Sequence, residues 1–231
     1  MTLDIKICGL KTGEAVDKAV SLGASHVGFI FFPKSPRHVE PETAGGLRQA
    51  ARNRAQVVAV SVNADDAALD AIVSAVAPDM LQLHGSETPE RVADVKARYN
   101  LPVMKALSIS NAKDLARARS YVGVADRLLF DAKPPKGAEL PGGNGVTFDW
   151  SLLHDLDGSL NYMLSGGLNA SNIGEALARV HPSGLDISSG VESAPGVKDV
   201  ALIEDFFASV RAAVKRAARM PNSMPNSRRT A

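Results

Sequence analysis

The stretch DIKICGL at residues 4–10 predicts a short β-strand that ends at Gly9. Alternation along the strand places Ile5 and Ile7 on one face and Lys6 and Cys8 on the other. Cys8 is the only cysteine in 231 residues, and it therefore ends this strand on the face that carries Lys6. A free cysteine commonly packs as a small hydrophobe, whereas a lone cysteine at a strand end is also a candidate catalyst.

The same pattern recurs along the chain, each time followed by a helix-like segment. We expect further strands near residues 25–31, 56–62, 79–84, 102–107, 126–131, 161–165 and 184–188. Eight units give about 29 residues each, the size of a β/α repeat in a closed barrel, whereas a doubly wound open sheet has fewer strands. The sequence therefore predicts an α/β fold, a single-domain (β/α)8 TIM barrel over residues 1–218.

Helix signals lie between the predicted strands. Leu69, Ile72, Val73 and Val76 form one apolar stripe that stops at Pro78, as expected of an amphipathic barrel helix.

Capping residues support the same assignment. Pro41 and Pro89 suit first-turn positions, Thr88 is placed to cap one helix, and Asn169 is placed to cap the helix over residues 173–180.

The last predicted helix buries Ile203, Phe207, Val210 and Val214. It gives way to a polar tail over residues 219–231, which repeats Met-Pro-Asn-Ser and is expected to be disordered.

Composition restricts the class of protein. The chain is 45% hydrophobic and 22% charged, so it can bury a large core. A net charge of +1 provides no general attraction to nucleic acid or to an anionic membrane, and we expect neither as a partner. One cysteine excludes an internal disulfide and favours a reducing compartment. No signal peptide and no run of about 18 apolar residues is present, so the cytoplasm is the expected location.

Barrel enzymes place their chemistry at the C-terminal ends of the strands and in the loops that follow. In this chain those positions hold Cys8, residues 32–38, residues 82–85, Asp131 and the loop over residues 133–146.

Two glycine-rich segments follow the seventh and eighth strands, at residues 165–167 and 186–190. Glycines leave backbone N–H groups open to an anion, and these two loops are the usual phosphate site of a barrel. Either segment alone can be an ordinary loop closure. Together they predict a phosphorylated small molecule as the ligand.

Asp131 has two interpretations. It can cap a turn or pair with Lys133, or it can face Cys8 across the barrel mouth. Proton transfer in both directions at one substrate requires two groups in different protonation states, and a thiolate with a carboxylic acid is such a pair.

A series of motifs occurs in the order known from one enzyme family. They are KICG at 6–9, GFIF at 28–31, SPR at 35–37, QLHG at 82–85, GGNG at 142–145 before FDW at 148–150, SGGL at 165–168 and SSGVE at 188–192. The chain resembles the phosphoribosylanthranilate isomerases of tryptophan biosynthesis, from residue 4 to about residue 215.

The resemblance implies an Amadori rearrangement without cofactor or metal, in which N-(5'-phosphoribosyl)anthranilate changes from an aminoaldose to an aminoketose. By analogy, Asp131 is the general acid that protonates the furanose ring oxygen, and Cys8 is the general base that removes the C2 proton. Lys6, or a nearby helix N-terminus, is a candidate to lower the pKa of the thiol.

The resemblance also implies substrate contacts. Arg37 would hold the anthranilate carboxylate, the alternative being a solvated loop arginine. The phosphate would be held by Gly166, Gly167, Ser188, Ser189 and Gly190.

Asp186 is expected either to bind ribose hydroxyls or to pair with Lys6 or Lys105 inside the barrel. His84 receives no catalytic role, because an acid and a base are already assigned. The other histidines share no metal-ligand spacing with it, so we expect no metal. They are His26, His38, His154 and His181.

Other functions remain open from the sequence. A dual-substrate isomerase of the tryptophan and histidine pathways is one, although such enzymes use an aspartate where this chain has Cys8. A noncatalytic sugar-phosphate binder would need neither Cys8 nor Asp131, and a redox sensor would need an exposed thiol. We expect a monomer or a homodimer, in which residues 133–146 close over the substrate.

Overall fold

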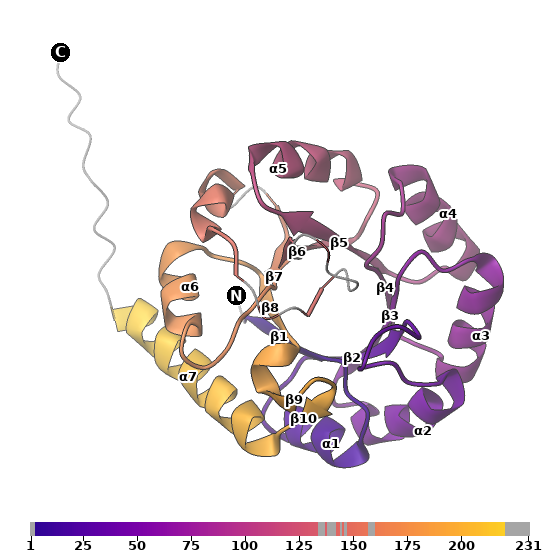
Figure 1. Ribbon diagram of the computed structural model, residues 1–231, viewed down its shortest axis with the longest axis horizontal. Helices are drawn as coiled ribbons and strands as arrows, with labels where there is room; N and C mark the ends of the chain where they lie inside the picture. Colours follow the sequence, from indigo (N-terminus) through magenta and orange to yellow (C-terminus); the bar gives the residue numbers. More distant parts are fainter. Residues whose placement is uncertain are drawn as a thin grey trace.

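The computed structural model describes residues 3–133, 137, 142–143, 145, 147–156 and 160–219, although not the side chains of 154–156 and 218–219 (Figure 1). All but the first residue of the predicted tail over residues 219–231, and most of the predicted closing loop over residues 133–146, lie outside the described residues.

Eight parallel strands form a closed barrel, because each strand pairs with the next and β8 pairs with β1. The strands are β1 (Asp4–Cys8), β2 (His26–Phe31), β3 (Gln56–Ser61), β4 (Met80–Leu83), β5 (Val103–Ile109), β6 (Arg127–Ala132), β7 (Tyr162–Leu164) and β8 (Gly184–Ile187). The predicted strands and the predicted barrel are confirmed.

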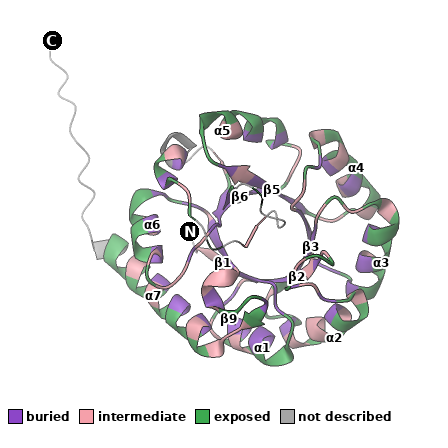
Figure 2. Cartoon of the chain, in the orientation of Figure 1, coloured by how far each residue is buried: buried purple, intermediate pink, exposed green. Residues whose placement is uncertain are grey.

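Helices surround the barrel, with their buried faces toward the strands (Figures 1 and 2). They are α1 (Gly13–Ser21), α2 (Pro41–Ala51), α3 (Asp66–Val76), α4 (Pro89–Tyr99), α5 (Ala112–Ala118), α6 (Ile173–Arg179) and α7 (Val200–Arg219), with short 3₁₀ helices at Arg119–Tyr121, Trp150–Leu156 and Ser189–Val191. None of the described helices is long and apolar enough to cross a bilayer.

The predicted helix starts are correct for α2 and α4 and wrong for α6. Pro41 and Pro89 occupy the first turn of their helices, and the Thr88 hydroxyl accepts a hydrogen bond from a backbone N–H of α4. Asn169, however, caps the turn before α6, because its Oδ1 accepts the N–H groups of Ser171 and Asn172. The helix itself starts after Asn172.

Burial on α7 differs from the prediction at its C-terminal end. Ile203, Phe207 and Val210 are buried as expected, and so is Phe206, which the predicted stripe omitted. Val214 is 46% exposed, and none of the described side chains beyond Val210 is buried. On α3 the predicted stripe is buried except for Val73, which is only partly covered.

Side chains inside the barrel form a small cluster separate from the larger core between barrel and helices. The interior cluster contains Cys8, Val58, Val60, Met80, Met104, Ala106, Leu129 and Met163. Lys105 stands between two members of this cluster, Met104 and Ala106. Because alternate residues of a strand face opposite sides, Lys105 faces the helices instead.

A short hairpin between β8 and α7 lies outside the repeating β/α pattern. Its strands, β9 (Glu192–Ala194) and β10 (Val197–Lys198), pair antiparallel. Gly196 has a φ of +81°, which glycine adopts most readily, and a Cβ there would overlap the Pro36 carbonyl. The hairpin therefore packs closely against the loop that carries Arg37.

Candidate active site

A pocket opens at the C-terminal ends of the strands and collects most of the residues singled out in the sequence. Those that line it are Cys8, Arg37, Asp131, Gly166, Gly167, Asp186, Ser188 and Ser189. Ile30, Val60, Val62 and Leu168 add apolar surface. Gly190 is not among the lining residues. A few polar groups that converge in a partly apolar pocket are typical of a small-molecule site.

Cys8 ends β1 and points into the barrel opposite Gly28 of β2. A Cβ on Gly28 would lie 3.0 Å from the Cys8 Sγ and 3.1 Å from the Lys6 Cε, so glycine leaves room for both side chains. Only 5% of Cys8 is exposed, which does not fit the exposed thiol of a redox sensor.

Burial raises the pKa of the Cys8 thiol above its ordinary value. Lys6 and Lys198 act in the opposite direction, and the negative charge of Asp186 adds to the increase. Lys6 therefore favours the thiolate, as the sequence suggested, but burial outweighs it. A thiolate formed here is scarce and correspondingly basic.

Asp186 of β8 forms an ion pair with Lys6 at 2.8 Å, and both side chains are buried. Burial alone would lower the pKa of Lys6, but Asp186 and Cys8 outweigh it and raise that pKa. The expected pairing with Lys6 is confirmed and the alternative with Lys105 is wrong, because Lys105 faces the helices and pairs with Glu87 at 2.9 Å.

Asp131 of β6 accepts a hydrogen bond at one carboxylate oxygen and lies close to a histidine ring at the other. Oδ1 accepts the Ala132 N–H at 2.8 Å, and Oδ2 lies 3.2 Å from the His84 Nε2. The position of a Cβ on Gly142 is 2.5 Å from Oδ2, so Gly142 also packs directly on this carboxylate.

His84 is the site residue that the sequence argument left unassigned. The Gln82 side-chain amide lies 3.1 Å from the His84 Nδ1. Since an amide nitrogen donates, Nδ1 accepts and the proton is on Nε2, which is buried and forms no hydrogen bond within the described part of the chain. The signal in the sequence was Gln82 and His84 two residues apart at a strand end, which places both on one face.

Arg37 is buried, so the interpretation as a solvated loop arginine is wrong. Its Nε and Nη2 donate to the two carboxylate oxygens of Glu192, each at 2.8 Å, and Nη2 also donates to the Gly143 carbonyl at 3.2 Å. Gly9 has a φ of +76°, and a Cβ there would lie 2.8 Å from the Arg37 Cδ. The glycine after Cys8 therefore makes room for the Arg37 side chain.

The glycine-rich segments after β7 and β8 face each other at the pocket. Gly166 and Gly167 have φ values of +90° and +61°, which favour glycine. A Cβ on Gly190 would overlap the Leu168 carbonyl, so Gly190 permits close contact between the two loops. The Ser188 hydroxyl donates to the Cys8 carbonyl at 3.1 Å and thereby joins the loop after β8 to the end of β1.

Residues that could bind a metal do not gather in the part of the chain that the structure describes. No group of three or more His, Cys, Asp or Glu side chains there is arranged to hold an ion.

Comparisons with known proteins match nearly the whole chain. The family model of N-(5'-phosphoribosyl)anthranilate (PRA) isomerase matches residues 5–209. An N-(5'-phosphoribosyl)anthranilate isomerase from Mesorhizobium japonicum is 70% identical over 92% of this chain and 97% of its own length. The chain belongs to the phosphoribosylanthranilate isomerase family. It is accordingly an isomerase, and its barrel is that of the family.

Solved structures of phosphoribosylanthranilate isomerases have the same fold. The enzyme from Thermotoga maritima has a TM-score of 0.82 and 35% identity, and the match covers 91% of this chain and 100% of that one. A phosphoribosylanthranilate isomerase in complex with reduced 1-(o-carboxyphenylamino)-1-deoxyribulose 5-phosphate has a TM-score of 0.80 and 33% identity over the same shares.

Proposed function

We propose that this chain isomerises N-(5'-phosphoribosyl)anthranilate to 1-(2-carboxyphenylamino)-1-deoxyribulose 5-phosphate in tryptophan biosynthesis, with Asp131 as general acid and Cys8 as general base. The observation that carries the assignment is that a thiol and a carboxyl group from strands far apart in sequence line one pocket, together with Arg37 and two glycine-rich loops. Membership of the isomerase family supports the reaction, and the pocket supports the residues.

The first step is ring opening. Asp131 donates its proton to the furanose oxygen, the bond between C1 and that oxygen breaks, and the nitrogen lone pair forms a C1=N iminium. The proton is delivered from Oδ2, which faces the pocket beside His84, since Oδ1 is engaged by a backbone N–H.

The second step is removal of the C2 proton. The Cys8 thiolate takes that proton, the C–H electrons form a C1=C2 double bond, and the iminium electrons return to nitrogen. The positive iminium acidifies the C2 proton, so a thiolate is a sufficient base. The enol then loses its hydroxyl proton while C1 gains one, which gives the ketose.

Separate groups are proposed to hold the two ends of the substrate. Arg37 is the candidate for the anthranilate carboxylate, and the backbone N–H groups and hydroxyls after β7 and β8 are the candidates for the phosphate. Asp186 lines the pocket and is fixed by Lys6, so its second oxygen is available to ribose hydroxyls.

The test is a steady-state assay of the loss of substrate fluorescence. We compare the wild type with Cys8→Ala, Asp131→Ala and, as a matched control, Asp17→Ala in an exposed ion pair. We expect an active wild type, a decrease of about 100-fold or more in both pocket variants, and no change in the control. Activity that survives in Cys8→Ala or Asp131→Ala contradicts the corresponding role.

Other outcomes separate the alternative functions. If the wild type binds the reduced product analogue but shows no turnover, the protein is a sugar-phosphate binding protein. A wild type that also converts the aminoaldose of histidine biosynthesis is a dual-substrate isomerase. One solved structure is of monomers generated from the dimeric phosphoribosylanthranilate isomerase of Thermotoga maritima. We propose that this chain is a monomer or a homodimer, which light scattering measures directly.

A further inference from the structure

Three buried charged side chains, none of them part of the proposed proton transfers, form one cluster at the pocket. Arg37, Glu192 and Lys198 have side chains that are 5%, 3% and 3% exposed. Glu192 and Lys198 come from the β9–β10 hairpin and do not line the pocket, whereas Arg37 does. Burial of a charged group is costly unless it is paired, so all three depend on their mutual contacts.

Glu192 connects the two cations. Its Oε1 accepts from the Arg37 Nε at 2.8 Å and from the Lys198 Nζ at 2.7 Å, and its Oε2 accepts from the Arg37 Nη2 at 2.8 Å. Burial would raise the pKa of Glu192, but the hydrogen bond from Arg37 and the charge of Lys198 lower it, so the carboxylate stays ionised. Two cations and one anion leave a net charge of +1.

This contact determines which edge of Arg37 faces the ligand. A guanidinium usually grips a carboxylate with two parallel N–H groups. Here Glu192 already occupies the edge formed by Nε and Nη2, and the second Nη2 hydrogen is directed to the Gly143 carbonyl. Within the described part of the chain no hydrogen bond is made by Nη1, so Nη1 is the donor left for a ligand carboxylate.

Lys198 connects Glu192 to the loop after β8. Its Nζ donates to the Ser188 carbonyl at 2.8 Å and lies 3.2 Å from the Ser188 Oγ, in addition to its bond with Glu192. Ser188 in turn donates to the Cys8 carbonyl. One lysine thus contacts both the partner of the carboxylate-binding arginine and a serine of the predicted phosphate loop.

We propose that Glu192 and Lys198 are positioning residues for the two ends of the substrate: Glu192 aligns Arg37 for the anthranilate carboxylate, and Lys198 fixes Ser188 for the phosphate. The proposal rests on the proposed function for the identity of the ligand. It assigns the β9–β10 hairpin a function in specificity rather than in the barrel scaffold.

The test measures direct binding by calorimetry, so it does not depend on turnover. Three ligands are used: the reduced product analogue, the same compound without its ring carboxylate, and ribose 5-phosphate. The variants are Glu192→Gln, which keeps the shape but replaces one acceptor with a donor, and Lys198→Met. Glu204→Gln, in an exposed ion pair with Lys18, is the control with the same chemical change.

We expect the wild type to prefer the carboxylate-bearing analogue over its carboxylate-free form. In Glu192→Gln this preference falls about tenfold while ribose 5-phosphate affinity stays within a factor of about two, because the loss is confined to Arg37. In Lys198→Met the affinity for ribose 5-phosphate falls about tenfold. In kinetics, Glu192→Gln raises KM and leaves kcat close to the wild type.

An unchanged preference in folded Glu192→Gln overturns the assignment of Glu192, and unchanged ribose 5-phosphate binding in Lys198→Met overturns that of Lys198. If Glu192→Gln alone fails to fold, the double variant Arg37→Met with Glu192→Gln is compared with Arg37→Met: an equal loss of the carboxylate preference shows that Glu192 acts through Arg37, and a larger loss shows that it does not. A wild type that binds none of the three ligands contradicts the proposed function instead.

Discussion

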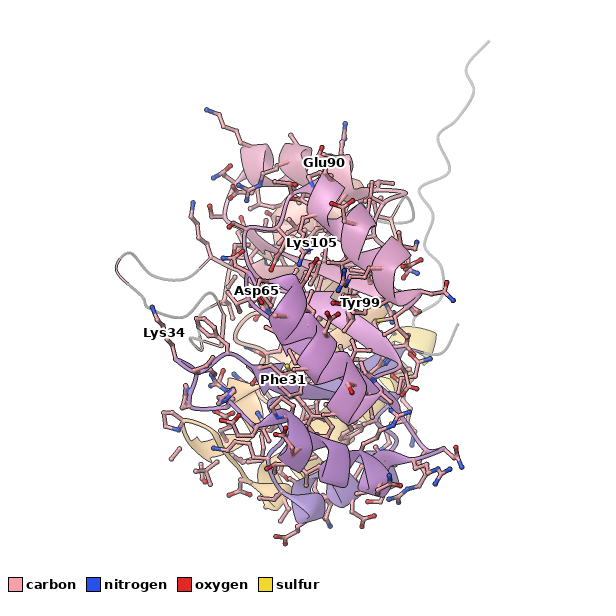
Figure 3. The ribbon with its side chains drawn as sticks, turned by 90° about the vertical axis from the view of Figure 1, so that its right-hand side faces the viewer. Phe31, Lys34, Asp65, Glu90, Tyr99 and Lys105 are labelled. Atoms are coloured by element: carbon pink, nitrogen blue, oxygen red, sulfur yellow. The ribbon has the colours of Figure 1, made fainter. Side chains whose placement is uncertain are left out.

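Two lysines of the barrel wall are both buried and ion-paired, yet they serve opposite sides of the wall. Lys6 on β1 points into the barrel, contacts Asp186 and lies beside Cys8, whereas Lys105 on β5 points toward the helices and contacts Glu87. In Figure 3 Lys105 lies deep among the side chains, while Lys34 on the loop after β2 points outward. Burial and pairing alone therefore do not identify a functional lysine.

The surroundings of each lysine explain the difference. Burial would lower the pKa of Lys6, but Asp186 and, where it is ionised, Cys8 outweigh it and raise that pKa. Burial lowers the pKa of Lys105 despite Glu87. The Lys105 Nζ also donates to the carbonyls of Leu83 and Gly85, so it holds the loop after β4 in place. We propose that the inner pair, Lys6 with Asp186, serves the pocket and that the outer pair, Lys105 with Glu87, serves the fold.

The largest expected effect on stability comes from the outer pair. Lys105→Met leaves the Glu87 carboxylate buried without its cation, and we expect it to lower the free energy of unfolding by about 3–5 kcal/mol. Urea unfolding measures this loss. The control is Lys96→Met, whose ion pair with Asp126 is exposed and should contribute less than about 1 kcal/mol. Equal losses of stability in Lys105→Met and Lys96→Met would show that the buried pair stabilises the fold no more than an exposed pair does.

The largest expected effect of a lysine on catalysis comes from the inner pair. Lys6→Met removes the cation nearest the thiolate, and we expect kcat/KM at neutral pH to fall about 10- to 100-fold. Steady-state assays of folded protein measure the fall, with Lys105→Met as the comparison. If Lys105→Met loses as much kcat/KM per folded molecule as Lys6→Met, the inner pair has no special role.

A smaller effect is expected at the opposite end of the barrel, where His26 begins β2. Burial lowers the pKa of His26. Above about pH 6.5 the ring is neutral in both the folded and the unfolded chain, so burial of His26 costs no stability there. As the pH falls below that value the unfolded chain binds the proton first, and stability decreases until the pH passes the lowered pKa of the folded chain.

Urea unfolding between about pH 5 and pH 7.5 measures that decrease. His26→Gln should flatten the pH dependence. If the free energy of unfolding of His26→Gln still depends on pH in this range, other groups cause the dependence.

Much of the fold was predictable because its signals are local. Strands and the helix starts at Pro41 and Pro89 follow from alternation, periodicity and capping within a few residues. The helix start at Asn169 was misplaced, because a capped turn precedes the helix there. Val214 was misassigned because periodicity does not show where the barrel surface ends.

The site was predictable at strand ends and unpredictable between them. Cys8, Asp131 and Asp186 were predicted at strand ends and line one pocket, because a barrel brings the C-terminal ends of its strands together. The contact between Arg37 and Glu192 spans 155 residues and requires a hairpin of only a few residues, for which the sequence offers no periodic signal. The contact of His84 with Asp131 likewise follows only from closure of the barrel.

The most direct test of the central claim is titration of the one thiol in the wild type, Lys6→Met and Lys105→Met, read by ultraviolet absorbance of the thiolate. Cys8 is the only cysteine, so subtracting the titration of Cys8→Ala, in which the three tyrosines still ionise, leaves the signal of one thiol. We predict a pKa above the ordinary thiol value in the wild type, a further increase in Lys6→Met, and no change in Lys105→Met. A wild-type pKa below the ordinary value, or equal responses of the two lysine variants, would contradict the claim.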